Sequence, residues 1–155
     1  MPIARLTARP GWVWSAAMAL FLGTFVVPAA LAAEPVGLWL TEGGKSRVEI
    51  APCGDKLCGT IVWLKEPLDD AGKEKVDANN PDEALRSRKL LGLPLLNGFV
   101  RASEDGVWEN GTIYNPEDGK TYRSKMTLKD ADTLKVRGYV GIPLFGKTQI
   151  WTRVK

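Results

Sequence analysis

The sequence predicts an all-β domain of about eight antiparallel strands, either a sandwich or a barrel, with one short helix in a long loop. Glycine and proline divide the chain after residue 36 into short β-rich runs. The run 120–128 alternates apolar and polar side chains, as a strand with one buried face does. About 123 residues remain after a predicted signal peptide, which is enough for one modest core.

The first 32 residues predict a signal peptide. Arg5 and Arg9 form a basic start, residues 12–27 an apolar core, and 30–32 a small-residue cleavage site. The apolar core is about 16 residues long, shorter than the roughly 20 that a spanning helix needs, and no later stretch is apolar enough. We therefore expect one domain over 33–155, periplasmic or secreted and without a membrane span; an uncleaved anchor is the minor alternative.

Charge and composition exclude several classes of function. The chain has 21 Lys and Arg against 18 Asp and Glu, and loss of the signal peptide leaves 19 against 18, too balanced for a nucleic-acid binder. It has no histidine, so Ser-His and Cys-His nucleophile pairs and imidazole metal ligands are absent. Asp69 and Asp70 lie in a polar stretch, where an acid–base pair is not expected to be desolvated. The sequence predicts no enzyme, metal or cofactor.

The predicted strands follow one another as antiparallel neighbours. Tyr122, Ser124, Met126 and Leu128 share the inward face of the sixth strand, and 129–132 and 115–119 are turns. The expected ranges are 37–41, 46–52, 57–64, 98–103, 111–115, 120–128, 133–140 and 147–154.

Two cysteines, Cys53 and Cys58, flank the turn formers Gly54 and Asp55. In an oxidising compartment this spacing predicts a disulfide across a hairpin turn. The alternative, a redox-active pair, is disfavoured because such cysteines usually stand two residues apart at a helix start. We expect a structural bond.

The stretch 65–88 is a polar insertion, either a lid or a solvated loop. Asn80 and Pro81 predict the start of a short helix that ends near Arg88. The acids of this stretch do not alternate as calcium ligands must. Arg86 and Arg88 can receive a carboxylate or phosphate headgroup, but pairing with Asp82 or with helix carbonyls is the favoured interpretation.

Several motifs carry a resemblance. They cover residues 77–82, 85–88, 91–99, 108–122 and 137–153. They resemble a family of exported bacterial proteins catalogued as domain of unknown function 2147. The resemblance implies a lipocalin-like β-barrel and no particular reaction.

A second similarity, to lipocalin-type barrels, rests on Gly37-Leu38-Trp39 near the start and Arg153 near the end. In such barrels an Arg of the last strand stacks on the Trp of the first and closes one end. For Trp39 and Arg153 we therefore favour barrel closure over contact with a ligand.

Aromatic side chains suggest a ligand pocket, although core packing is the alternative for each of them. The candidate ligand-binding residues are Trp108, Tyr114, Tyr122, Met126, Arg137 and Tyr139. The leading hypothesis is an exported protein that binds a small apolar or lipid-like ligand. The alternative is a cell-envelope protein interaction module that uses the loops 65–88 and 141–146. Its apolar tip, 142–145, is either an exposed contact surface or a buried plug of the barrel.

Overall fold

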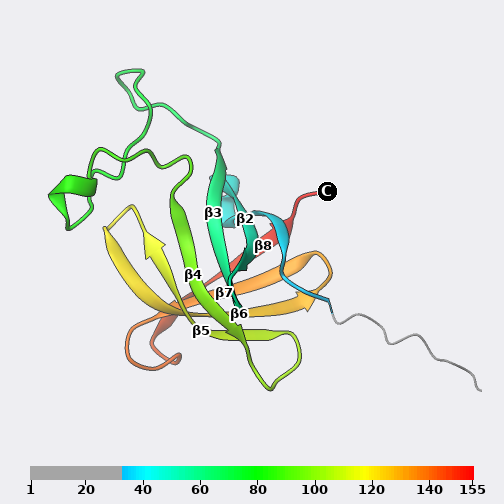
Figure 1. The fold of residues 1–155 in the computed structure, drawn as a ribbon. Coiled ribbons are helices and arrows are strands. Elements are labelled where there is room, and N and C mark those ends of the chain that lie inside the picture. The colour runs from blue at the N-terminus through cyan, green and yellow to red at the C-terminus, as the bar shows by residue number, and fades with distance from the viewer. Residues whose placement is uncertain (1–32) are drawn as a thin grey trace, which may run out of the picture. The chain divides into compact units, whose positions relative to one another are not determined.

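Eight antiparallel strands form a closed barrel in which each strand pairs with its neighbours in sequence order (Figure 1). The structure is a computed structural model that describes residues 33–155, so the predicted signal peptide lies outside the described residues. The strands are β1 (Gly37–Leu40), β2 (Ser46–Cys53), β3 (Lys56–Leu64), β4 (Pro94–Arg101), β5 (Val107–Asn115), β6 (Lys120–Asp130), β7 (Thr133–Tyr139) and β8 (Gly146–Arg153).

The first and last strands close the sheet. Trp39 of β1 pairs with Arg153 of β8, and Leu40 pairs with Thr152. The predicted antiparallel barrel is therefore confirmed and the sandwich is wrong. Because every described strand has both its neighbours, the sheet of residues 33–155 is complete without any further segment.

Two strand starts were predicted too late. β4 begins at Pro94 rather than Gly98, and β5 begins at Val107 rather than Gly111. Proline without an N–H is tolerated at the first residue of a strand, and both glycines lie inside strands. Gly98 has a φ of 77°, and a Cβ on Gly111 would overlap the ring of Phe99. The glycines mark a distortion and a close approach, not strand ends.

The short helix expected between Asn80 and Arg88 is present as a single 3-10 turn, which begins later than expected and has Asp82 rather than Asn80 as its cap. The helical segments described in 33–155 are two short 3-10 turns, η1 (Glu42–Gly44) and η2 (Glu83–Leu85). Asp82 caps η2, since its side chain accepts a hydrogen bond from the N–H of Ala84 at 3.0 Å. Tertiary contacts hold Asn80 in a buried position instead. Neither described turn is long and apolar enough to cross a membrane.

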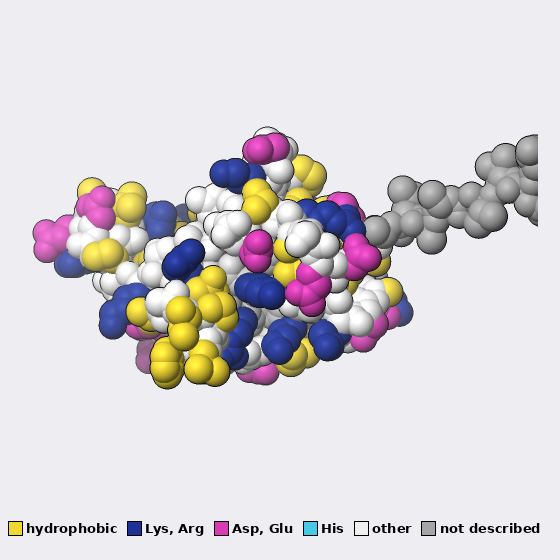
Figure 2. Space-filling view, turned by 90° about the horizontal axis from the view of Figure 1, so that it is seen from below, with side chains coloured by type: hydrophobic (Ala, Val, Ile, Leu, Met, Phe, Trp, Pro, Cys, Tyr) yellow, Lys and Arg dark blue, Asp and Glu magenta, His cyan; other side chains and the backbone are white. Residues whose placement is uncertain are grey.

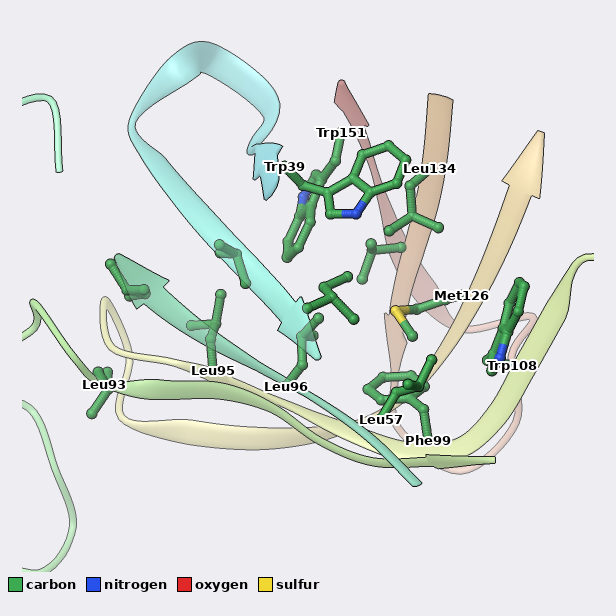
Figure 3. Packing of buried hydrophobic residues seen from close by; sticks show 14 residues of the cluster. Trp39, Leu57, Leu93, Leu95, Leu96, Phe99, Trp108, Met126, Leu134 and Trp151 are labelled. Carbon is green, nitrogen blue, oxygen red and sulfur yellow. The ribbon is translucent and has the colours of Figure 1, made fainter. Parts of the chain in front are cut away.

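Inward-facing side chains form one hydrophobic cluster inside the barrel (Figure 3). The alternation predicted for β6 is confirmed, because Ser124 and Met126 are buried while Thr121 and Arg123 are exposed. The buried members of the cluster are Trp39, Val48, Ile50, Leu57, Ile61, Leu93, Leu95, Leu96, Phe99, Trp108, Met126, Leu134, Val136 and Trp151.

The two ends of the barrel differ. One end, which we call the closed end, holds the short turns 54–55, 102–106 and 131–132 and the outer ends of β1 and β8. The other end, which we call the mouth, holds the loops 41–45, 65–93, 116–119 and 140–145. Three of these loops, 65–93, 116–119 and 140–145, lie on the left of Figure 1.

Covalent and stacking contacts support the closed end. The predicted disulfide between Cys53 and Cys58 is present across the β2–β3 hairpin, where Gly54 takes a φ of 74°. The guanidinium carbon of Arg153 lies 4.3 Å from the ring centroid of Trp39. The three guanidinium nitrogens also donate to backbone carbonyls 22 to 119 positions away in the sequence, so Arg153 joins distant parts of the chain.

Candidate functional site

A cavity of about 1310 Å³ opens at the mouth of the barrel. Its deep side is apolar and consists of residues that also belong to the core cluster: Ile61, Leu95, Val136 and Trp151. Ile113, Leu64 and Leu90 extend this apolar wall toward the mouth. Charged side chains gather at the rim: Glu42, Lys45, Lys65, Glu66, Lys75, Glu117, Asp118 and Lys147.

The cavity exists because small and polar residues replace large apolar ones toward the mouth. Along β7 the inward positions are Leu134, Val136 and Gly138, so the side-chain volume ends where the cavity begins. Gln149, opposite Val136, also lines the cavity, and its Oε1 accepts a hydrogen bond from Nε1 of Trp151 at 2.8 Å. The core therefore fills only the part of the barrel nearer the closed end.

The segment 65–93, between β3 and β4, is anchored at the mouth by a buried carboxylate. The Asp77 side chain is fully buried and accepts hydrogen bonds from three partners. Tyr114 donates its hydroxyl at 2.6 Å, Asn80 its amide at 2.7 Å, and Arg88 donates from Nη2 at 2.8 Å and Nε at 3.0 Å. Tyr114 belongs to β5 and lines the cavity, so this network joins the segment to the cavity wall.

The β5–β6 turn, 116–119, connects the loops of the mouth. Nδ2 of Asn79 lies 3.1 Å from the carbonyl oxygens of both Pro116 and Glu117. Glu117 also pairs with Lys45 of the β1–β2 loop at 2.8 Å. At Gly119, where φ is 67°, a Cβ would overlap the carbonyl oxygen of Asn79. A side chain there would prevent the segment 65–93 from docking on the turn.

The polar groups of the wall are held in defined protonation states. Burial, followed by the hydrogen bond to Asp77, raises the pKa of the Tyr114 phenol above its ordinary value. Tyr122 donates to Asp118 at 2.6 Å, which raises the pKa of Tyr122 and lowers that of Asp118. Both phenols therefore stay neutral at physiological pH, and the carboxyl group stays ionised.

Three of the six predicted ligand-binding residues line the cavity, namely Tyr114, Tyr122 and Tyr139. Trp108 and Met126 do not. They face each other across β5 and β6, are 2% and 0% exposed, and belong to the packed core. Their apolar character was visible in the sequence, but their position along the barrel axis, away from the mouth, was not.

Arg137 also lies away from the cavity. It stands on the outer face of β7, and its three guanidinium nitrogens donate to the Pro143 carbonyl, the Leu144 carbonyl and the Thr148 hydroxyl. These hydrogen bonds direct the guanidinium toward the β7–β8 loop and β8 rather than into the cavity. The residue organises the β7–β8 loop instead.

Asp77 and Asn80 organise the site although no sequence pattern predicted this role. Both lie in a polar stretch that was interpreted as a lid, a solvated loop or a helix start. Arg88 was expected to pair with Asp82 or with helix carbonyls, but it pairs with Asp77. Arg86 donates to the carbonyl of Asn80 at 2.8 Å. The arginines serve the structure, as favoured, but with different partners.

Comparisons with known proteins agree with this architecture. Residues 37–153 match the model of a family described as an uncharacterized protein conserved in bacteria, DUF2147. The fold is similar to the solved structure of a Helicobacter pylori protein described as belonging to the lipocalin family. That similarity has a TM-score of 0.69 and 25% sequence identity, and covers 79% of this chain and 84% of the other. No curated protein sequence matches the chain significantly.

Proposed function

The chain belongs to the bacterial family DUF2147. We propose that it is an exported protein that binds a small, largely apolar molecule in its barrel. The observation that carries the proposal is the cavity of about 1310 Å³ behind the mouth. Ligand pockets usually measure roughly 300–1,000 Å³, so this space accepts a molecule of lipid or drug size. Because water gains little from an apolar wall, an apolar guest replaces it favourably.

The rim suits a guest with a polar or anionic end. Lys65 and Lys147 line the cavity, and neither has a carboxylate within ion-pair distance among the described residues. Tyr122 and Tyr139 add polar atoms to a mainly apolar wall. An apolar body would lie against Ile113, with its polar end near the lysines.

Binding rather than catalysis is the role that these groups favour. The carboxylates at the rim are exposed or already paired, so none is poised as a general base. The disulfide across the β2–β3 hairpin suits an oxidising compartment, which supports the proposed export to the periplasm or beyond. The comparisons do not favour the alternative, a protein interaction module built on the loops 65–88 and 141–146.

Extraction and displacement experiments test the proposal. Native mass spectrometry of protein purified from its own host should show a bound apolar molecule, and a fluorescent fatty-acid probe should bind saturably. Ile113→Glu places a charge on the apolar wall and should weaken probe binding at least tenfold, because burying an unpaired carboxylate is costly. Ile150→Glu is the matched control, since Ile150 is exposed on the outside of β8.

Circular dichroism of both variants separates a binding defect from misfolding. The proposal fails if native protein is always empty and no apolar probe binds saturably. It also fails if Ile113→Glu, correctly folded, binds the probe as tightly as the parent chain and the Ile150→Glu control do.

A further inference from the structure

The loop between β7 and β8, residues 140–145, exposes four large apolar side chains to water. Val140 is 69% exposed, Ile142 54%, Leu144 74% and Phe145 71%. The tip is therefore not the buried plug that was one of the two expectations. Figure 2 shows a group of hydrophobic side chains on the side where this loop lies in Figure 1, with Lys and Arg side chains beside it. A contiguous exposed apolar group of this kind marks an interaction surface.

The loop is held in this exposed conformation. Nε of Arg137 donates to the Pro143 carbonyl at 2.6 Å, and Nη2 donates to the Leu144 carbonyl at 3.1 Å. Within the loop, the N–H of Phe145 donates to the Ile142 carbonyl at 3.1 Å. These hydrogen bonds satisfy the Pro143 and Leu144 carbonyls and hold the loop in a conformation that leaves Ile142 and Leu144 exposed to water. The loop is a presented surface and not a frayed end.

Basic side chains lie along the outer face of β6 and β7, the strands that lead to the loop and lie beside it. Arg123 and Lys125 of β6 and Lys135 and Arg137 of β7 stand on the same outer face, where Lys125 is opposite Arg137. Of the five Lys or Arg in residues 133–155, Arg153 and Lys155 lie at the closed end, where Lys155 pairs with Asp132 at 3.1 Å. Two carboxylates reach the basic part of the surface from other elements.

One of these carboxylates is Glu104, whose oxygen lies 3.8 Å from Nζ of Lys125. The other is Glu42, which accepts from the N–H of Ile150 at 3.3 Å. Arg123, Lys135 and Arg137 have no carboxylate within ion-pair distance among the described residues, so this face carries unpaired positive charge. The face thus combines an apolar tip with basic side chains, although the barrel chain as a whole is almost neutral.

We infer that the β7–β8 loop and the basic outer face of β6 and β7 dock on the surface of an anionic lipid membrane. Apolar side chains that enter the acyl boundary and cations that meet lipid phosphates are the two components of interfacial binding. A second copy of the chain is a poorer partner, since its equally basic face would repel this one.

Docking would bring the mouth to the lipid, since Val140 and Phe145 also line the cavity. An apolar molecule could then pass between the membrane and the barrel. Only this consequence rests on the proposed function. Membrane docking itself requires nothing of the cavity.

Vesicle flotation with the chain 33–155 tests the inference, because its sheet is complete without other segments. The chain should float with vesicles of phosphatidylcholine and phosphatidylglycerol and much less with phosphatidylcholine alone. Ile142→Ser with Leu144→Ser should reduce binding at least about tenfold, because two exposed apolar anchors are lost. Val62→Ser with Leu85→Ser is the matched control, which removes two exposed apolar residues elsewhere and should bind as the parent does.

Charge is tested separately. Lys125→Gln with Lys135→Gln should weaken binding to the anionic vesicles roughly 30-fold, because each cation near such a surface contributes about one factor of five. High salt should reduce binding of the parent chain in the same direction.

Absence of flotation with anionic vesicles at low salt would overturn the inference. So would equal flotation of the loop variant and its control. Self-association that disappears in the loop variant, or a protein partner lost with it, without vesicle binding would assign the surface to a protein instead. None of the four substituted apolar residues lines the cavity, so probe binding in the same variants reports on the proposed function independently.

Discussion

Asp77→Asn removes the buried negative charge that anchors the segment 65–93 at the mouth, with almost no change in side-chain size. The carboxylate is fully buried and receives donors from Arg88, Tyr114 and Asn80. An asparagine amide presents an NH2 group toward donors that need an acceptor. At least one donor is then left unpaired, and the others lose their charge-assisted character.

The magnitude follows from the exposure of the partners. Breaking a fully buried ion pair costs about 3–5 kcal/mol, but the Arg88 side chain is 35% exposed and can recover part of its hydration. We assign about 2 kcal/mol to this pair and about 1 kcal/mol to the weakened hydroxyl bond of Tyr114. The variant should therefore lose about 3 kcal/mol of unfolding free energy, or roughly 10 °C in Tm for a domain of this size.

Two assays distinguish global from local loss. Urea unfolding followed by tryptophan fluorescence gives the free energy, and amide hydrogen exchange over 77–90 reports undocking of the segment while the barrel stays folded. Leu91→Ser, an exposed substitution in the same segment, is the control. The reasoning is refuted if Asp77→Asn lies within about 0.5 kcal/mol of the parent and exchange over 77–90 is unchanged.

Three further results are expected. Arg153→Met should lower the unfolding free energy by about 2 kcal/mol in urea titrations, because the stack on Trp39 and three carbonyl acceptors lose their partner, whereas an unchanged midpoint would contradict a role in closure. Gly119→Ala should cost about 2 kcal/mol and release the segment that Asn79 anchors, visible as faster amide exchange, because it adds both an overlap and a positive-φ penalty. Because the folded protein raises the pKa of Tyr114, the stability that this phenol contributes is complete below the ordinary tyrosine pKa of about 10 and is lost as pH rises through the higher folded value. Tyr114→Phe should therefore reduce the fall in unfolding free energy that urea titrations measure from about pH 9 upward.

Local patterns predicted much of the barrel. The period-two alternation of 120–128, the turn residues around Gly119 and the Cys53–Cys58 spacing each correspond to features of the structure. The strand starts at Pro94 and Val107 were missed because the neighbouring apolar residues show no alternation and because glycines inside strands resemble boundaries.

The candidate site was predicted less well, for a geometric reason. Alternation tells which side chains face inward but not how far along the barrel axis each one lies. Met126 and Tyr122 share a face of β6, yet Met126 belongs to the packed core and Tyr122 lines the cavity. Asp77 lies in one of the motifs that carry the family resemblance, but nothing in the sequence indicated its burial, because a polar residue in a polar loop looks the same whether water or a buried network surrounds it.

Local sequence patterns thus predicted the strand content, the hairpin turns and the disulfide, because each depends on residues that are near one another in sequence. The absence of histidine chemistry follows from composition alone. Closure of β1 on β8 was expected only from the resemblance to lipocalin-type barrels, and the division of the interior into core and cavity and the burial of Asp77 against Tyr114 were decided by the tertiary structure alone. These features join residues far apart in the chain. Their free energy exists only once the whole sheet has closed.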